Sequence, residues 1–216
     1  MTSSKLEFLR VESGLHELGY LPDSFPPDVE AAIRDYWPPL EWLRRVSPRR
    51  QVRLTTFEIA KTPVRFDSLF DPYDTEGATC ISDVCELVDR RLAEQGLRLP
   101  TEDEFEAACG VGSFWWGDFV PEGDPYSAAD AVVRTNSAGL QFLADSYTTE
   151  LVRNVFKLGD GGVAVCGEAP WPMAWLSLAT CYREWASSGD EPGTADLLSE
   201  TLEEAYLRPV RLSSDF

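Results

Sequence analysis

Histidine and cysteine are the residues best suited to nucleophilic or metal chemistry, and both are scarce in this chain. Its 216 residues include five cysteines and one histidine, His16. A Ser-His-Asp or Cys-His catalytic pair would have to use His16, and nothing in residues 14–17 indicates a nucleophile. The number of cysteines is odd, and a chain long enough to form its own core does not need disulfide bonds. We therefore expect a reducing, cytoplasmic setting.

Carboxylates and aromatic rings are plentiful by comparison. Residues 99–133 and 184–207 contain no Lys or Arg, and the first of these stretches interleaves acidic residues with Phe, Trp and Tyr. Aromatic rings supply anchoring area in protein interfaces, and carboxylates steer a basic partner. The alternative is that the carboxylates form a solvated face and the rings belong to the core. We expect partner-binding residues here, namely Phe114, Trp115, Asp118, Glu122 and Asp124.

The net charge of −18 excludes some classes of partner. Nucleic acid and anionic membranes carry the same sign as this chain, so we expect neither to bind, whereas a basic protein fits. The alternative is that the acidity only aids solubility. No stretch approaches the roughly 20 apolar residues of a membrane span, and residues 1–10 have no signal-peptide core.

Several elements that must position these residues can be predicted from local patterns. Apolar residues at helical spacing predict an amphipathic helix from Ile81 to Leu92, ending near Gly96. The sequence 101–104, Thr-Glu-Asp-Glu, is a capping box and predicts a second helix with Phe105, Ala108 and Cys109 buried. Alternation over 51–57 predicts a strand, with a second short segment around 59–64.

The organisation along the chain indicates one domain with an extension. A hydrophobic content of 44% is enough for one sizeable core. Six prolines in residues 1–46 and at position 48 limit helices there to short pieces such as 28–37, and the aromatic residues argue for a packed extension. Residues 47–216 form the main domain, in which a long loop region begins near Gly110.

Residues 98–106, Arg-Leu-Pro-Thr-Glu-Asp-Glu-Phe-Glu, resemble the R-L-P-T-E-x-E-W-E signature of the formylglycine-generating-enzyme (sulfatase-modifying factor) family, with Phe105 in place of the tryptophan. Five further segments resemble family motifs in the family's order. The resemblance implies an α+β fold of the C-type-lectin-like kind, loop-rich, with a small antiparallel sheet and few helices. The five segments are 57–64, 116–118, 136–140, 161–162 and 206–211.

The family's copper chemistry depends on two cysteines separated by four residues, and here the resemblance breaks. Cys166 stands at about the place of the first, but Trp171 stands at the second. Thiolates suit Cu(I), so Cys166 with Cys181 is the alternative pair for a copper- or thiol-dependent oxidase. Cys80 and Cys85 repeat the family spacing, but Cys85 belongs to the apolar stripe of a predicted helix, which favours a structural role.

Two further metal sites of the family are also altered. The related sulfoxide synthases bind iron through several histidines, which the single His16 cannot replace. The family's metal-supporting G-N-V-W-E-W motif corresponds here to residues 145–150, of which only Glu150 keeps the motif's carboxylate. A structural calcium near Glu150 is the site that this carboxylate would allow.

These observations lead to one function and one alternative. We expect a non-catalytic protein-binding module on this scaffold, with no cofactor, which recognises a basic protein through its acidic, aromatic-rich face. Divergent family members neutralise bacterial toxins as immunity proteins, so the resemblance makes a basic toxin a plausible partner. The alternative is the oxidase that uses Cys166 with Cys181.

Overall fold

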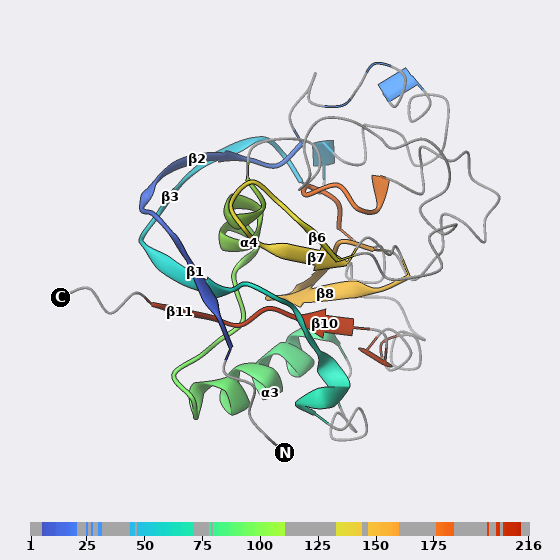
Figure 1. Ribbon diagram of the computed structural model, residues 1–216. Helices are drawn as coiled ribbons and strands as arrows, with labels where there is room; N and C mark the ends of the chain where they lie inside the picture. The colour runs from blue at the N-terminus through green and yellow to red at the C-terminus, as the bar shows by residue number, and fades with distance from the viewer. Residues whose placement is uncertain are drawn as a thin grey trace.

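The computed structural model describes residues 6–20, 47–70, 80–110, 133–143, 147–159, 176–183 and 205–212, together with isolated positions between these ranges. Within these residues the architecture is mixed α+β, with two α-helices, a 3-10 turn and several small sheets (Figure 1). The α+β fold class expected from the sequence is confirmed. No helix among the described residues is long and apolar enough to cross a membrane.

A long two-stranded ribbon is the first feature of the fold. Strand β1 (Phe8–Val11) pairs with β4 (Phe57–Ala60), and β2 (Gly14–Leu18) pairs with β3 (Arg50–Leu54), both in antiparallel fashion. The sequence pattern predicted one strand over 51–57, but the structure divides it at a bend. At the bend the backbone N–H of Ser13 donates to Thr56 Oγ1. Residues 8–18 of the extension therefore pair directly with the main domain.

The last described stretch of the chain, residues 205–212, contributes one strand to each of two sheets. Strand β11 (Val210–Leu212) pairs with β4 and completes the sheet β1-β4-β11. Strand β10 (Ala205–Leu207) lies in the second sheet, between β5 (Val64–Arg65) and β8 (Thr149–Val152). The pairing of β10 with β8 is parallel, whereas the other pairings in the sheet are antiparallel. The segment 206–211, which resembles a single family motif, is thus divided between two sheets.

Three shorter elements complete the strand inventory of the described residues. Strand β9 (Val155–Lys157) forms the edge of the second sheet beside β8. Strands β6 (Val133–Thr135) and β7 (Gln141–Leu143) form a separate antiparallel pair. The 3-10 turn η1 (Phe66–Ser68) follows β5 directly and buries Phe66.

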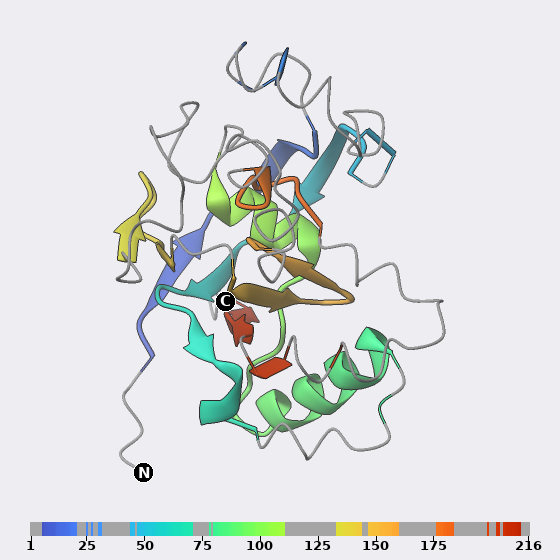
Figure 2. The ribbon, with the colours of Figure 1, turned by 90° about the vertical axis from the view of Figure 1, so that its right-hand side faces the viewer.

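Helix α3 (Ile81–Ala93) confirms the predicted amphipathic helix. Its buried residues are those at helical spacing in the sequence, Cys85 and four aliphatic residues. They pack in one core with Leu151 of β8 and Leu207 of β10. Figure 2 shows α3 along one side of the molecule, away from the ribbon. Gly96, which follows the helix, has φ of +69°, a conformation that glycine adopts without strain.

Helix α4 (Glu102–Cys109) begins where the capping box predicted. The N–H of Glu104 donates to Thr101 Oγ1 at 3.2 Å, and the N–H of Thr101 donates to Glu104 Oε2 at 2.8 Å. Both bonds satisfy donors that the first turn would otherwise leave free. The helix lies on the concave side of the bent ribbon (Figure 1). Its residues Phe105, Ala108 and Cys109 enter a second core with Phe57 and Val210.

Candidate functional site

The sequence-predicted site residues divide into those that the structure describes and those that it does not. The interface residues Phe114, Trp115, Asp118, Glu122 and Asp124 lie outside the described residues, as do Cys166 and Trp171. Cys181 and Glu150 are described, and so are the cysteines of the two helices.

Cys181, the described half of the alternative thiol pair, is 3% exposed. Burial raises the pKa of its thiol to about 12, although the nearby Lys157 charge acts in the opposite direction. Because metal ligation and nucleophilic attack both need the thiolate, this environment opposes both at neutral pH. Among the described residues, no group of three or more His, Cys, Asp or Glu side chains is placed to hold a metal ion.

The helical cysteines are part of the packing. The Cys85 thiol donates to the carbonyl of Val152 and its sulfur accepts the N–H of Asn154, which fixes the turn between β8 and β9 against α3. Burial raises the pKa of Cys85 to about 11 and raises that of Cys109 further. Cys85 and Cys109 lie in the apolar stripes predicted for them, whereas Cys80 is half-buried at the N-cap of α3.

Glu150 is bound by a guanidinium from Arg208. The two side chains form a bidentate ion pair, with Arg208 Nη2 at 2.7 Å and Nε at 3.0 Å from the carboxylate oxygens. Arg208 is 1% exposed and donates further bonds to the carbonyls of Ala60, Lys61 and Gln141. Its guanidinium also lies over the Phe142 ring. Arg208 therefore supplies the positive charge that the buried Glu150 requires.

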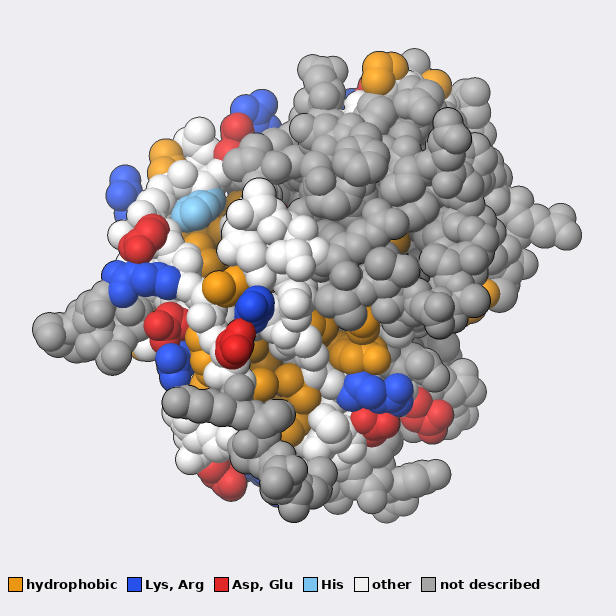
Figure 3. Space-filling model, viewed as in Figure 1, with side chains coloured by type: hydrophobic (Ala, Val, Ile, Leu, Met, Phe, Trp, Pro, Cys, Tyr) orange, Lys and Arg blue, Asp and Glu red, His pale blue; other side chains and the backbone are white. Residues whose placement is uncertain are grey.

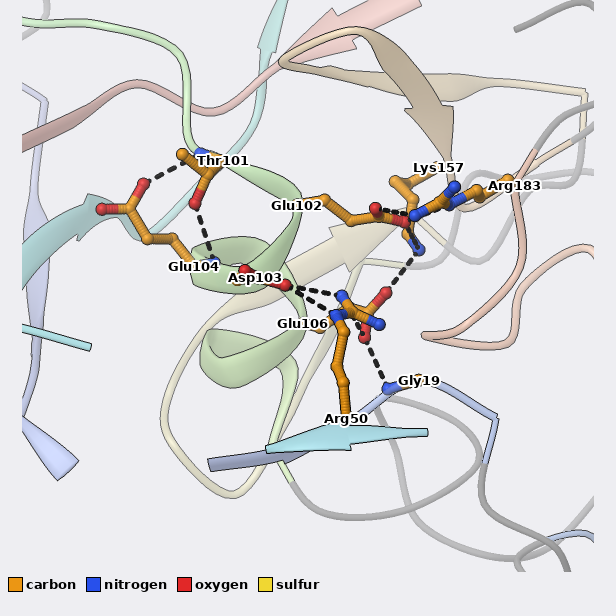
Figure 4. A network of polar contacts seen from close by, with 9 residues as sticks. All are labelled: Gly19, Arg50, Thr101, Glu102, Asp103, Glu104, Glu106, Lys157 and Arg183. Carbon is orange, nitrogen blue, oxygen red and sulfur yellow. Dashed lines mark hydrogen bonds and ion pairs between the residues drawn. The ribbon is translucent and has the colours of Figure 1, made fainter. Parts of the chain in front are cut away.

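The largest polar arrangement among the described residues surrounds the first turns of α4 (Figure 4). We call Glu102, Asp103 and Glu106 the α4 carboxylates. Lys157 is 0% exposed, and its Nζ lies 3.0 Å from Glu106 Oε1 and 3.2 Å from Glu102 Oε1. Arg183 binds both oxygens of Glu102.

The remaining contacts of the α4 carboxylates reach the ribbon. Glu106 Oε2 accepts the backbone N–H of Gly19 at 2.9 Å and lies 3.2 Å from Arg50 Nη2. Arg50 Nε also donates to Asp103 Oδ1 at 2.8 Å. One short helix is thereby connected to the end of β2, the start of β3, the end of β9 and the segment 176–183.

Helical spacing explains why these carboxylates act together. Glu102 and Glu106 are four residues apart, so they lie on one face of α4 and repel each other unless a cation stands between them. Lys157 supplies that cation. The N-terminal turn of a helix also favours negative charge. Glu104 points in another direction and forms a bidentate pair with Arg98.

The electrostatics favour the charged forms of Lys157 and Glu102. Burial alone would lower the pKa of Lys157, but Glu106 and Glu102 raise it above its ordinary value. Burial would likewise raise the pKa of Glu102, but Lys157 and Arg183 lower it. A charged lysine is a poor nucleophile and an ion-paired carboxylate a poor base, so the arrangement suits positioning better than proton transfer.

Sequence reasoning found the acidic members of this site but not its cations. The capping-box pattern placed Glu102 and Glu106 on a helix, whereas nothing in the spacing of Arg50, Lys157 and Arg183 links them to it. The usable signal was Lys157 itself, because a lysine in the apolar run 155–158 needs a counter-charge if both faces of the strand are buried.

Comparisons with known proteins give evidence on the fold alone. No protein-family model matches the chain, and no curated protein matches it. Among solved structures it is similar to Treponema denticola variable protein 1, with a TM-score of 0.52 and 13% sequence identity. The match covers 99% of this chain and 98% of that protein. The two chains therefore share an overall fold over nearly their whole lengths, at an identity too low to carry function.

Proposed function

We propose that this chain is a non-catalytic protein-binding module on a formylglycine-generating-enzyme-like, C-type-lectin-like scaffold, and that it recognises a basic protein partner. The binding face is the acidic, aromatic-rich stretch that contains Phe114, Trp115, Asp118, Glu122 and Asp124. Support for the scaffold comes from six motif resemblances in the family's order and from the capping box formed at Thr101 and Glu104.

The distribution of charge along the chain carries this proposal. Of the 37 Asp and Glu residues, 15 lie in the stretches 99–133 and 184–207, which contain no Lys or Arg. The other 22 acidic residues are accompanied by all 19 Lys and Arg residues. Most of the net negative charge therefore belongs to these two stretches.

Ion pairing within the described residues strengthens the contrast. In Figure 3 acidic and basic side chains of these residues stand beside one another instead of forming patches of one sign. Pairs of this kind give little long-range field, whereas unbalanced carboxylates attract a cationic partner over about a Debye length, roughly 8 Å at physiological salt. The exposed or half-exposed pairs are Arg10 with Glu12, Arg49 with Glu17, Lys61 with Glu7, Arg65 with Asp67, Arg153 with Asp89 and Arg211 with Glu58.

Within this class, neutralisation of a basic toxin is the specific role that we favour. An acidic surface suits the blocking of a cationic protein because opposite charge speeds encounter and penalises wrong partners. Such an immunity protein needs neither a cofactor nor a free thiol. The buried, protonated Cys181 fits that requirement better than it fits an oxidase.

Affinity capture with matched charge reversals tests the proposal. The wild-type chain should retain a basic protein that the double variant Glu122→Lys, Asp124→Lys loses. The control is Glu86→Lys, Glu94→Lys, which makes the same charge change at an exposed position of α3 and at its exposed C-cap residue. Equal capture by both double variants, or capture of an acidic protein, would contradict the proposed face. If the partner is a toxin, adding the chain should abolish its activity.

Binding kinetics then separate the electrostatic steering by carboxylates, which affects association, from the anchoring by aromatic side chains, which affects dissociation. Raising salt should slow association and leave dissociation nearly unchanged, because long-range fields act on encounter. The Glu122→Lys, Asp124→Lys variant should reproduce the salt effect, whereas Trp115→Ala should speed dissociation. Association that ignores both salt and charge reversal would mean that the acidity serves solubility alone.

Copper titration separates the proposed function from the alternative oxidase. We expect no stoichiometric Cu(I) binding in competition with a Cu(I) chelator, because Trp171 stands where the second cysteine of the family is expected. Tight one-to-one binding that disappears in Cys166→Ser would favour the oxidase.

A further inference from the structure

Besides residues 111–132, which follow the C-cap of α4 directly, three segments of the chain join the described residues next to α4. We call the residue at which a segment joins its root. Gly19 and Arg50 lie beside the root of segment 21–46, Lys157 lies just before segment 160–175, and Arg183 directly precedes segment 184–197. Each of these four residues contacts an α4 carboxylate.

The root of segment 21–46 is tightly closed. The N–H of Tyr20 donates to the carbonyl of Ser47 at 2.8 Å, so the residues on either side of the segment meet. Gly19 has φ of +88°, and a Cβ there would lie 2.3 Å from the carbonyl oxygen of Pro48. Only glycine fits this approach. Glu106 holds the closed root through the N–H of Gly19 and through Arg50.

The roots of the other two segments share one carboxylate. Glu102 binds Lys157 near the first of these roots and Arg183 at the second. After Lys157 the backbone turns sharply, since the buried Leu158 has φ of +59°. Before Arg183, the N–H of Tyr182 donates to the carbonyl of Ala179 at 3.0 Å.

The contacts form one uninterrupted path. Arg183 binds Glu102, Glu102 binds Lys157, Lys157 binds Glu106, and Glu106 binds Gly19 and Arg50. Lys157 and Glu106 at its centre are 0% and 3% exposed. In such a setting, removing one charge upsets the balance of charge around its partners at low dielectric, which is costly, so the neighbouring contacts must rearrange.

We propose that the path from Arg183 to Gly19 through α4 couples the three roots, so that loosening one root loosens the others. Glu102, Lys157 and Glu106 are then positioning residues for the three roots. The consequence for partner binding rests on the proposed function. The coupling itself does not, because it is a property of the described residues.

Amide hydrogen exchange on the full chain tests the coupling without any partner. Arg183→Gln should speed exchange of the Gly19 N–H, which lies at the opposite end of the path. Glu106→Gln should reciprocally speed exchange of the Tyr182 N–H. An energetic coupling of ordinary size would give about fivefold or more in each direction. Arg183 is half-buried, so this variant should remain folded.

The matched control is Glu104→Gln on the same helix. It makes the same chemical change, but Glu104 binds Arg98 and Thr101 and no root. It should speed exchange at Thr101 and leave Gly19 and Tyr182 unchanged. Unchanged exchange at Gly19 in Arg183→Gln would overturn the proposal. Faster exchange at Gly19 and Tyr182 in Glu104→Gln, equal to that in the other variants, would also overturn it, because it would indicate general destabilisation.

A second measurement distinguishes this inference from the proposed function. With a captured partner, Arg183→Gln should speed dissociation, because α4 at the centre of the path directly precedes the stretch that contains Phe114 and Asp124, whereas Glu104→Gln should not. If the exchange result is positive and the dissociation rates are equal, the coupling stands and the path does not position that stretch. If the exchange result is negative, the coupling fails whatever the partner does.

Discussion

Arg208 and Lys157 are both buried cations, but the structure uses them differently. Arg208 meets one carboxylate, Glu150, and fills its remaining donors with backbone carbonyls from β4, the following turn and β7. Lys157 meets two carboxylates of α4, each of which has another cation as well. The fixed, planar donors of arginine suit a joint between backbone segments, whereas the ammonium of lysine acts as a point charge within a group of ions.

The largest expected effect is at the arginine. Arg208→Met removes the one charged partner that Glu150 has among the described residues, together with three bonds to carbonyls, so we expect a loss of about 3–5 kcal/mol in the free energy of unfolding. Chemical denaturation measures it. The double variant Arg208→Met, Glu150→Leu should recover part of the loss because no unpaired carboxylate remains. A single variant of nearly wild-type stability would show that the pair is dispensable.

Lys157→Met should cost less than Arg208→Met, about 2 kcal/mol, because Glu106 keeps Arg50 and Glu102 keeps Arg183. The same denaturation experiment compares the two. The pKa of Lys157 is raised in the folded state, so its contribution is full below its ordinary value of 10.5 and falls as pH rises through the higher folded-state value. A larger loss than at Arg208 would reverse the contrast between the two cations.

Glu104→Gln should come next, with a loss of about 1.5 kcal/mol, since the partly exposed Arg98 can turn to water. Burial opposes the shift, but the Arg98 bond lowers the pKa of Glu104 below its ordinary value of 4.5. Its contribution is therefore present above about pH 4.5 and is lost as pH falls through the lower folded-state value. Unfolding at pH 7 and pH 3 should show the difference between wild type and variant shrinking. A stability difference that is the same at both pH values would mean that Glu104 stabilises the fold through packing and not through its charge.

The smallest effect is at the helix cap. Thr101→Ala removes one hydrogen bond of the capping box and should cost about 1 kcal/mol, whereas Thr101→Ser should cost much less because it keeps the hydroxyl. Comparing denaturation midpoints measures both variants. An unchanged midpoint for Thr101→Ala would mean that water caps the helix equally well.

The helices were predicted well because the patterns that signal a helix lie within a few neighbouring residues. The stripe of α3 and the cap of α4 depend on residues three or four apart, and both are confirmed. Strand pairing was less accessible, because β8 and β10 meet from residues far apart in the sequence. The extension's strands were missed, since alternation in residues 8–18 is weak and their pairing partners lie at 50–60.

The candidate site shows the same division. Glu102 and Glu106 could be placed on one helix face from sequence alone, but Gly19, Arg50, Lys157 and Arg183 reach them only through the tertiary fold. The interface residues Phe114 and Trp115, as well as Cys166, lie outside the described residues and remain predictions.

The division of residues 205–212 between two sheets has a consequence for synthesis on the ribosome. Strand β10 is the middle strand that joins β5 to β8, and β11 closes the other side of β4. The second sheet cannot be completed until residue 207 has left the exit tunnel, and the first cannot until residue 212 has, so residues made long before must wait with open strand edges. Such a chain folds late, through contacts of large sequence separation, and its nascent form is the one most exposed to aggregation.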